Sequence, residues 1–522
     1  MNRPDPAPAP GGASLNRRPH HPFAAFPAAL ALAALALPCL WLAPAPLALS
    51  LSAADQAESA VDRPNFLFII TDDISRDDLG CYGHPLVRTP HLDQLAAEGR
   101  LFENAYVVSS SCSVSRCSII TGRYPHNHGA PELHTQLPPG HFLFTQALKN
   151  AGYYTALSGK HHMGPAVNDS FDHIDGGSDP GMMGNWLELL QNRPEDQPFF
   201  FWFAAFDAHR PWRPSNHAVR YNPDDIEVPP YLVDSMATRE DLAEYYHAVS
   251  RTDHFVGLLR EELERQGIAD NTWIIYTADN GRPFPRDKTR VFDSGMAVPL
   301  IITRPGHTEP GRSASLASSI DLAPTILELA GLDGSERIQG VSLAPVIADP
   351  AAVVRDVIYS VHNWHVFQAH VRMVRHGDHV YARNAFPERR LWSIEASLRY
   401  PSGAELATAR DAGTLTEAQQ EVFLQPRPAE ELYHLPGDPL QLDNLAANPE
   451  HAPVLDHLRA LLDRWVEQTG DSVPDNPTAD RDDHDGNRLP DWERGEFPGA
   501  ATNAVEIDHP GPIFADQQPR DQ

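Results

Sequence analysis

The fold of this chain is decided by one continuous apolar run, Pro64-Asn65-Phe66-Leu67-Phe68-Ile69-Ile70-Thr71, which stops abruptly at Asp72-Asp73. A strand that is apolar on both faces is typical of a parallel sheet with helices on either side. Two adjacent carboxylates directly after such a strand cost free energy unless water or a cation stabilises them. The run therefore predicts a central buried strand whose carboxyl end carries a polar site.

The same arrangement recurs at three other apolar runs of the chain. Each ends in polar residues: Thr272–Ala278 before Asp279-Asn280-Gly281, residues 199–206 before Asp207-Ala208-His209-Arg210, and residues 153–158 before Gly159-Lys160-His161-His162. Stretches with helical periodicity, such as residues 90–100 and 240–266, separate the runs. This alternation predicts an α/β fold in which a large, mainly parallel sheet is sandwiched by helices. Because ligands bind beyond the carboxyl ends of such strands, we expect the polar residues to form one site.

The residue types at these strand ends indicate what the site binds. Four of them offer only oxygen ligands: Asp72, Asp73, Asp279 and Asn280. An all-oxygen set favours a hard cation, Ca²⁺ or Mg²⁺, over zinc or copper, and such a cation acts as a Lewis acid on an anionic substrate oxygen. Four further side chains supply positive charge and protons: Lys160, His162, His209 and Lys288.

A cysteine stands just ahead of a predicted helix, in Cys112-Ser113-Val114-Ser115-Arg116, which leads into Cys117-Ser118-Ile119-Ile120-Thr121-Gly122-Arg123. The unpaired N–H groups and the positive dipole end at a helix start favour an anionic or strongly polarised group. Arg116 lies about one turn further along the same face and can reach back to Cys112. From these residues alone, a half-buried cysteine beside a surface arginine remains the alternative.

The stretch from Cys112 to Arg123 resembles the signature of the type I sulfatases of the alkaline phosphatase superfamily, with Val114 where that family has proline. The resemblance implies that Cys112 is oxidised to formylglycine (3-oxoalanine) by a formylglycine-generating or equivalent enzyme, and that the hydrated aldehyde is the nucleophile. It also implies a Ca²⁺ ion held by the four oxygen ligands and in contact with residue 112. The implied fold is alkaline-phosphatase-like, a large mixed sheet between helices with a smaller C-terminal α+β domain.

Two more motifs match that family. Its Gly-Lys-x-His-x-Gly motif is present as Gly159-Lys160-His161-His162-Met163-Gly164, and its Asp-Pro-His-Arg-Pro motif as Asp207-Ala208-His209-Arg210-Pro211. The resemblance implies a role for each charged side chain. Arg116 holds the hydrate, Lys160 and Lys288 neutralise the sulfate oxygens, His209 protonates the leaving group, and His162 is a candidate base.

Within the family, residues 159–165, 227–230 and 279–285 look most like the sulfamidases, the N-sulfoglucosamine sulfohydrolases of heparan degradation. The implied function is a calcium-dependent sulfatase acting on a sulfated saccharide. An O-sulfatase of another sulfated glycan and a phosphoester or phosphonate hydrolase of the same superfamily stay open. An alternative from another class is an inactive sulfoglycan-binding protein with unmodified Cys112. Val114 favours that alternative, and the complete set of Asp, Lys and His residues argues against it.

The character of the sequence changes near residue 354, where shorter strand-like runs begin, and an amphipathic stretch follows at residues 453–468. We predict a leader over residues 1–54, a catalytic α/β domain over 62–353, a smaller α+β domain over 354–472, and an acidic, Pro/Gly-rich, extended or disordered tail over 473–522. Three histidines near the family's sugar-binding rim are candidate substrate contacts: His134, His362 and His365.

The formal net charge of −29 argues against a nucleic-acid partner, so a sulfated substrate needs local positive charge in its pocket. Arg17-Arg18 precede an Ala/Leu-rich run, which predicts an exported protein, periplasmic or extracellular. Prolines in that run favour a cleaved signal, with an uncleaved membrane anchor as the alternative. Cys39 lies in the leader, and the odd number of remaining cysteines implies no disulfide framework. The resemblance also suggests a homodimer.

Overall fold

An eight-stranded sheet organises the part of the chain that the computed structural model describes, residues 63–508. The predicted leader, with Cys39, lies outside these residues. The strand order is β4-β3-β5-β1-β6-β7-β2-β8, with β1 (Asn65–Thr71) near the centre. The other strands are β2 (Arg100–Tyr106), β3 (Tyr154–Gly159), β4 (His173–Asp175), β5 (Phe199–Ala204), β6 (Thr272–Ala278), β7 (Leu300–Thr303) and β8 (Gly311–Ser318). Only β7 runs antiparallel to its neighbours in this sheet.

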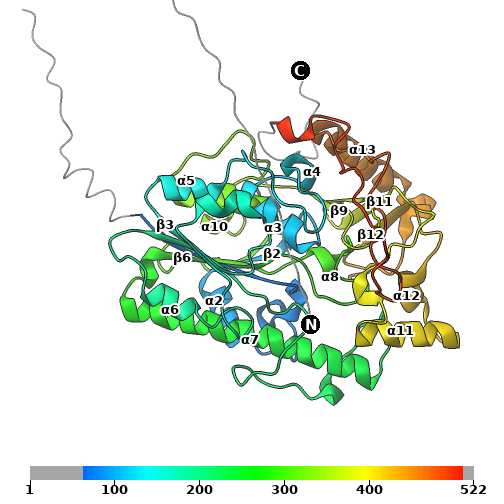
Figure 1. Cartoon of the computed structure of the whole chain (residues 1–522), viewed down its shortest axis with the longest axis horizontal. Helices are drawn as coiled ribbons and strands as arrows, with labels where there is room; N and C mark the ends of the chain where they lie inside the picture. Colours follow the sequence, from blue (N-terminus) through cyan, green and yellow to red (C-terminus); the bar gives the residue numbers. More distant parts are fainter. Residues whose placement is uncertain (1–62, 509–522) are drawn as a thin grey trace, which may run out of the picture. The chain divides into compact units, whose positions relative to one another are not determined.

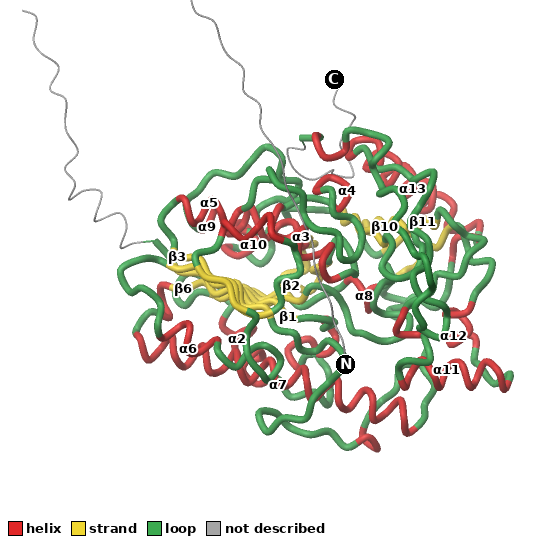
Figure 2. Tube along the Cα trace, in the orientation of Figure 1, coloured by secondary structure: helices red, strands yellow, loops and turns green. Residues whose placement is uncertain are grey.

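Helices cover both faces of this sheet (Figures 1 and 2). On one face, Leu67 and Ile69 of β1 pack in a cluster with α2 (Pro90–Glu98), α6 (Trp186–Gln191) and α7 (Met236–Gln266). On the other, Phe66, Phe68 and Ile70 pack with α3 (Cys112–Thr121), α5 (Phe144–Asn150), α9 (Leu322–Leu329) and α10 (Ala344–Ala348). Successive side chains of a strand point to opposite faces, so one unbroken apolar run serves both layers. This topology confirms the predicted α/β class.

A smaller antiparallel sheet follows in the C-terminal part, in the order β12-β11-β10-β9. Its strands are β9 (Val357–His362), β10 (Val371–His376), β11 (His379–Asn384) and β12 (Glu430–His434). Helix α13 (Ala452–Thr469) covers one face and buries Leu458 and Trp465 against Val374 and Tyr381. The remaining helices are α4 (Pro125–His128), α8 (Asp293–Met296), α11 (Pro401–Ala412) and α12 (Glu417–Gln420). A smaller α+β part is therefore present, while the boundaries at residues 353 and 472 stay predictions.

The C-terminal segment, residues 473–508, contributes no strand to either sheet in the described chain. It is held by side-chain contacts: Trp492 stacks on Trp364 with ring centroids 5.0 Å apart, and Arg494 forms a 2.9 Å ion pair with Glu132. Residues 509–522 lie outside the described residues. Among residues 63–508, no helix combines the length and the hydropathy that crossing a membrane requires.

A buried carboxyl between α2 and α7 makes stability depend on pH. Burial raises the pKa of Asp253 to about 7, although its Oδ1 accepts the Leu92 N–H at 2.7 Å. Since this pKa exceeds the unfolded value of about 3.9, ionisation between pH 4 and 7 costs stability, which falls as the pH rises through that window. We expect Asp253→Asn to raise the free energy of unfolding by ~2–4 kcal/mol at pH 8 and by far less at pH 4. Urea unfolding at the two pH values measures this.

Asp471 is a matched control because its pKa is shifted in the opposite direction to that of Asp253. Burial raises the pKa of Asp471, but the buried Arg372 guanidinium, 2.9 Å from Asp471 Oδ1, together with His126 and His370 outweighs burial, so the pKa is lowered. Asp471→Asn leaves that guanidinium without its counterion, so we expect a loss of ~3–5 kcal/mol at neutral pH. Equal effects of Asp253→Asn at pH 4 and pH 8 would contradict the assignment.

Candidate active site

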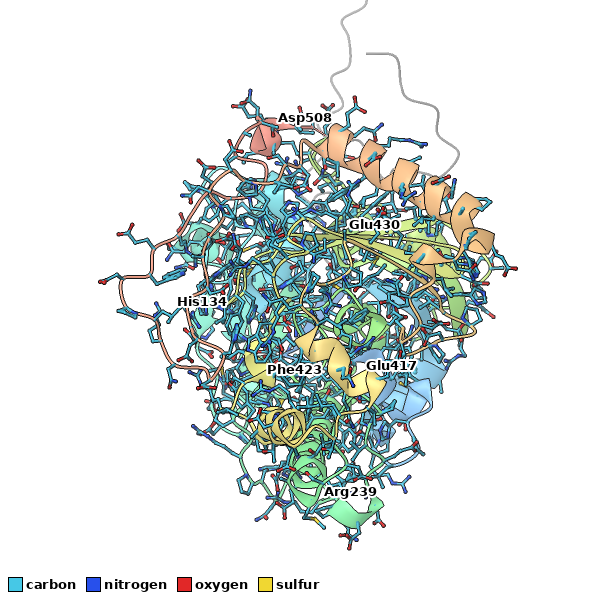
Figure 3. All side chains as sticks on the ribbon, turned by 90° about the vertical axis from the view of Figure 1, so that its right-hand side faces the viewer. His134, Arg239, Glu417, Phe423, Glu430 and Asp508 are labelled. Carbon is cyan, nitrogen blue, oxygen red and sulfur yellow. The ribbon has the colours of Figure 1, made fainter. Side chains whose placement is uncertain are left out.

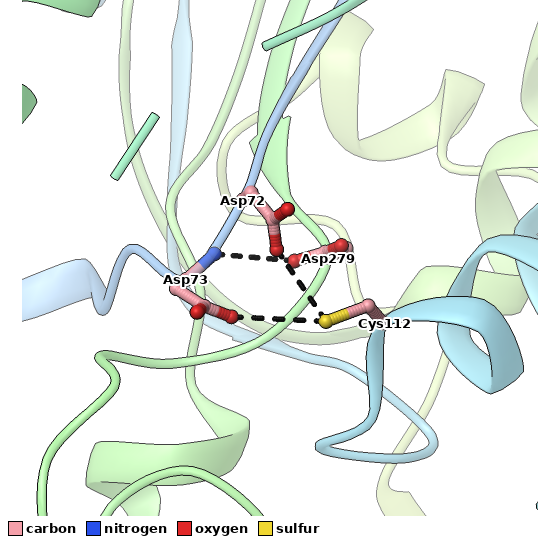
Figure 4. Close-up of side chains that lie close together, drawn as sticks. All are labelled: Asp72, Asp73, Cys112 and Asp279. Carbon is pink, nitrogen blue, oxygen red and sulfur yellow. Dashed lines mark hydrogen bonds between the residues drawn. The ribbon is translucent and has the colours of Figure 1, made fainter. Parts of the chain in front are cut away.

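The candidate site lies where β1 and β6 end and α3 begins (Figure 4). Asp72 and Asp73 follow β1, Asp279 follows β6, and Cys112 is the first residue of α3. One ligand atom from each of these four residues lies within 4.8 Å of the others, and the Cys112 thiol donates to Asp72 Oδ1 at 3.4 Å. Helix α3 begins earlier than predicted because Ser111 has extended backbone and serves as its N-cap. The thiol therefore stands in the first turn of the helix rather than ahead of it.

Backbone hydrogen bonds between the strand ends bring the carboxylates together. The Asp279 N–H donates to the Thr71 carbonyl at 3.0 Å, and the Asp72 N–H donates to the Asp207 carbonyl at 2.9 Å. The Asp73 N–H donates to Asp279 Oδ1 at 3.2 Å from a left-handed backbone, with φ of 59°. These bonds tie the ends of β1, β5 and β6 to one another. The expectation that separate strand ends form one polar cluster thus matches the observed geometry.

The donor set fits a hard divalent cation. Asn280 donates its amide to Asp73 Oδ1 at 2.7 Å, while its own Oδ1 is buried without a hydrogen-bond partner. A buried polar atom without a partner is rare in folded proteins and points to a ligand. Here it is an oxygen beside three carboxylates, the combination that Ca²⁺ and Mg²⁺ prefer. Asp72, Asp73, Asp279 and Asn280 are therefore the residues that would hold such an ion.

Three cationic side chains face these carboxylates. Lys288 Nζ lies 2.7 Å from Asp73 Oδ1, Lys160 Nζ pairs with Asp72 Oδ2, and Arg116 Nε donates to Asp279 Oδ2 at 2.8 Å. Burial raises the pKa of Asp73, but Lys288, His209 and Lys160 together outweigh burial, so the pKa is lowered. The three pairs balance the local charge. An added divalent cation makes the site net positive, which suits an anionic substrate.

The cysteine itself is buried, with 2% of its surface exposed. Burial first and the Asp72 carboxylate second raise the pKa of the Cys112 thiol well above its usual range, so it is neutral at physiological pH. A neutral thiol is a poor nucleophile. The unmodified cysteine is therefore not set up for thiolate chemistry.

The predicted catalytic histidines lie beside this cluster. Burial and then Lys288 lower the pKa of His209, and its Nδ1 lies 2.5 Å from the Arg210 carbonyl oxygen. His162 has a buried Nδ1 without a partner, and burial followed by Lys160 lowers its pKa. Both rings are thus neutral bases at physiological pH.

The three candidate substrate histidines are placed differently from one another. His134 is exposed, and its ring centroid lies 4.9 Å from that of His162. The backbone N–H of His134 donates to Ser113 Oγ at 2.9 Å. Figure 3, in which His134 is labelled, shows it beside the C-terminal segment. His365 Nδ1 lies 2.9 Å from Ser111 Oγ, next to the cysteine. His362 is 1% exposed at the end of β9, which leaves it the least access of the three. Substrate contact stays a prediction for all of them.

Sequence reasoning missed Glu395, which enters the site from the C-terminal part of the chain. Its carboxyl is buried, its Oε2 has no hydrogen-bond partner, and burial raises its pKa to about 7 against the opposing effect of Lys288. Glu395 lies far along the chain from every motif, so only the fold reveals it. A carboxyl with a pKa near 7 beside a site for an anion can make substrate binding depend on pH.

We expect Glu395→Gln to remove a pH dependence of KM. Below pH 7 the acid is neutral, and above pH 7 its carboxylate repels an anionic substrate. The KM of the unaltered enzyme should therefore rise ~3–10-fold between pH 6 and 8, while that of Glu395→Gln stays nearly flat. Steady-state kinetics across this range measures it, with the exposed Glu388→Gln as the control from the same segment. A variant with an unchanged KM profile would remove Glu395 from substrate binding.

The comparisons with known proteins agree with this geometry. Residues 64–332 match the family model for sulfatases, and residues 284–381 match the model described as N-sulphoglucosamine sulphohydrolase, C-terminal. The chain belongs to the sulfatase family, whose members hydrolyse sulfate esters or sulfamates.

Two curated relatives and one solved structure are similar to this chain. An Ulvan-active sulfatase of Formosa agariphila is 31% identical, with 79% of this chain and 76% of that protein covered. The human N-sulphoglucosamine sulphohydrolase is also 31% identical, with 78% and 90% covered. A solved structure, BT4656 in complex with its substrate D-glucosamine-2-N,6-O-disulfate, superposes with a TM-score of 0.61 at 20% identity, covering 78% of this chain and 98% of that one. At that identity the structure supports the fold alone.

Proposed function

We propose that this protein is an exported, calcium-dependent sulfatase that removes sulfate from a sulfated saccharide, with an N-sulfated glucosamine as the leading substrate. The observation that carries the proposal is the cluster of Asp72, Asp73, Asp279 and Cys112 within 4.8 Å, with Lys160 and Lys288 paired to its carboxylates. Such an arrangement combines a hard-cation site, a modifiable residue and two ammonium groups in one buried pocket. The N-sulfate preference is supported by the human relative and by the C-terminal family match.

Two groups would complete this site, Ca²⁺ on the four oxygen ligands and a formylglycine made from Cys112 by an oxidising enzyme. When present, they supply a Lewis-acidic charge for a sulfate oxygen and a nucleophilic oxygen for the sulfur. Lys160 and Lys288 bind and neutralise the sulfate oxygens. Arg116 donates to Asp279 and thereby holds that carboxylate in position. These residues hold the substrate so that the sulfur–nitrogen or sulfur–oxygen bond that breaks points away from residue 112.

The two histidines divide the proton transfers. His209 donates Nδ1–H to the Arg210 carbonyl, so Nε2 is the nitrogen that exchanges protons with the leaving group. Because the neutral ring has no proton on Nε2, it must first take one up from solvent before it passes that proton to the leaving amine or alkoxide oxygen. His162 is neutral, so its unpartnered Nδ1 would be able to act as the base toward residue 112 once that residue is converted to formylglycine.

An O-sulfatase is the second candidate, because the Ulvan-active sulfatase is as similar to this chain as the human sulphohydrolase. The two candidates share the charged cluster and differ in the leaving atom. Kinetics on N-sulfated and O-sulfated glucosamine, with an aryl phosphate ester as a third substrate, separates them. A higher kcat/KM on the phosphate ester would move the protein to the phosphoester hydrolases of the superfamily.

The first test is the mass of the peptide covering residues 101–116, from protein made in its native host. A mass below that of the unmodified thiol, together with reactivity toward an aldehyde reagent, is the expected result. An intact thiol in every molecule would contradict the formylglycine and favour an inactive sulfoglycan-binding protein. Cys117, in the neighbouring peptide, is the internal control and should keep its thiol mass.

A further inference from the structure

A cavity of about 380 Å³ lies between the loop after β4, the loop after β5 and helix α7. No step of the proposed sulfate transfer uses this cavity. Its volume falls within the ~300–1,000 Å³ that is typical of small-molecule sites. The larger part of its wall is apolar and comes from Pro180, Met182, Phe206, Pro211 and Pro214.

Phe206 belongs both to this cavity and to the candidate active site. Its ring centroid lies 4.7 Å from that of His209 and 5.7 Å from Lys160 Nζ. The same ring is half-buried and lines the cavity. In the proposed reaction, Lys160 binds the sulfate and His209 exchanges protons with the leaving group. A saccharide whose sulfated unit reaches His209 therefore has the cavity directly beside it.

Hydrogen bonds fix the walls of the cavity. The Phe206 N–H donates to the Gly181 carbonyl at 2.8 Å, which joins the loops after β5 and β4. Arg251 of α7 donates to Asp207 Oδ1 at 2.8 Å and to the Arg213 carbonyl at 2.6 Å. Gly181 has a φ of 60°, and a Cβ there would lie 2.5 Å from Asp207 Oδ2, so this closely packed position requires glycine. The cavity is therefore preformed, as small-molecule sites usually are.

The charged groups of the cavity form two ion pairs, so its own charge is balanced. Arg251 and Asp207 make the buried pair. The other pair is exposed: Arg213 Nη1 donates to Asp179 Oδ2 at 3.1 Å, and these side chains are 71% and 73% exposed. Such an exposed pair contributes only ~0–1 kcal/mol, so its guanidinium can donate and its carboxylate can accept hydrogen bonds from a ligand instead. Balanced charges give no preference for a second anionic group.

A sugar ring matches this combination of groups. It carries C–H groups on its faces, which pack against apolar and aromatic side chains, and hydroxyl groups around its edge, which donate and accept hydrogen bonds. Phe206, Met182 and the prolines offer the first kind of contact, and Arg213 with Asp179 offers the second. A sugar ring bonded to the sulfated unit therefore fits both the position and the chemistry of the cavity.

We propose that this cavity binds the sugar unit joined to the sulfated one, so that the substrate is an oligosaccharide rather than a free sulfated monosaccharide. The inference rests on the proposed function, to which it adds the length of the substrate. It also assigns the way in which the second unit is recognised. Phe206 and the apolar wall contact the face of the ring, and Arg213 and Asp179 bind its hydroxyl groups.

The test compares N-sulfated glucosamine with a disaccharide in which the same unit is joined to a neutral hexose. We expect kcat/KM to be ~10-fold or more higher on the disaccharide, because contacts of the second ring add to the binding of the transition state. The ratio of the two kcat/KM values should change less than ~2-fold between ~0.05 M and ~0.5 M NaCl, since salt screens charges and not hydroxyl contacts. A ratio near one, or a ratio that collapses in salt, would overturn the proposal.

Two variants address the cavity itself. Arg213→Ala removes the hydrogen-bond donor, and Pro214→Trp adds bulk to the wall, so each should lower the disaccharide-to-monosaccharide ratio at least ~3-fold. Both positions are exposed, and an unchanged Tm shows that the variants fold. An unchanged ratio in both variants would remove the cavity from substrate binding.

Arg220 supplies the matched control on the same loop. It is an exposed arginine that pairs with Glu244 at 2.8 Å, and it is not among the residues that line the cavity. Arg220→Ala removes one positive charge as Arg213→Ala does, so it should leave the ratio within ~1.5-fold of the original value.

Calorimetry separates this inference from the proposed function. Cys112→Ala protein is expected not to turn over either sugar, so binding is measured at equilibrium. We expect the disaccharide to bind ~10-fold or more tightly than the monosaccharide, and the added change Arg213→Ala to reduce that advantage. Failure of the unaltered protein to turn over either sulfated sugar would contradict the proposed function. Equal affinities of the two sugars for Cys112→Ala protein would overturn the cavity site.

Discussion

Replacement of Cys112 by alanine is expected to lower kcat on a sulfated glucosamine by ~10⁴-fold or more. The substitution removes the thiol group whose oxidative loss converts Cβ into the aldehyde, while Asp72, Asp73 and Asp279 remain to bind the cation. Alanine is smaller than cysteine, so it fits the buried position at the start of α3 without strain. Steady-state kinetics measures the loss of kcat, and a Ca²⁺ titration measures whether the variant still binds the cation.

Cys117 is the control on the same helix. Its Sγ lies 3.9 Å from the Met163 carbonyl oxygen within the apolar cluster under α3, away from the carboxylates. Cys117→Ala should therefore cost ~1–2 kcal/mol of stability and change kcat less than ~3-fold. Substantial turnover by Cys112→Ala would show that residue 112 is not the nucleophile.

Replacement of Asp73 by asparagine is expected to weaken Ca²⁺ binding by ~10²-fold or more and to lower kcat/KM by ~10³-fold. The change removes one carboxylate ligand and leaves the Lys288 ammonium, 2.7 Å away, buried without its counterion. An unpaired buried charge costs ~3–5 kcal/mol, so Asp73→Asn is measured beside the double variant Asp73→Asn/Lys288→Met, which removes that charge as well. Calorimetric titration of the chelator-treated protein with Ca²⁺ measures the Ca²⁺ affinity.

The neighbouring Asp77 provides the comparison for this variant. Its side chain is 55% exposed and pairs with Arg76, so Asp77→Asn should leave the Ca²⁺ affinity within ~2-fold. A chelator should abolish the activity of the unaltered enzyme, and added Ca²⁺ should restore it. Full activity in chelator, or unchanged Ca²⁺ affinity of both Asp73 variants, would contradict a calcium site here.

Four strands of the large sheet and two long helices could be predicted from the sequence because each depends on nearby residues. The apolar runs became β1, β3, β5 and β6, the helix predicted over residues 240–266 is α7, and the one over 453–468 is α13. A local pattern was sufficient for these elements. The apolar run marks the strand, and the polar residues directly after it mark the end of the strand at which the site forms.

The contacts between distant segments could not be predicted in the same way. Glu395 lies close enough to Lys288 for the two charges to interact, and nothing in either stretch of sequence indicates the other. His376 and His457 are 81 residues apart, and their contact depends on how α13 lies across the small sheet. The pattern of apolar residues also does not show that α3 begins at Cys112, directly after the extended backbone of Ser111.

The C-terminal segment has a consequence for how proteins of this kind can diversify. Arg494 pairs with Glu132 and donates to the Leu133 carbonyl, so the segment borders the exposed His134 without supplying any strand to the sheets. Changes of length or sequence in this segment can reshape the surroundings of His134 while the buried carboxylates and lysines keep their positions. The prediction that His134 contacts the saccharide therefore implies that new saccharide preferences can arise by exchange of a terminal piece of chain, while the buried site stays unchanged.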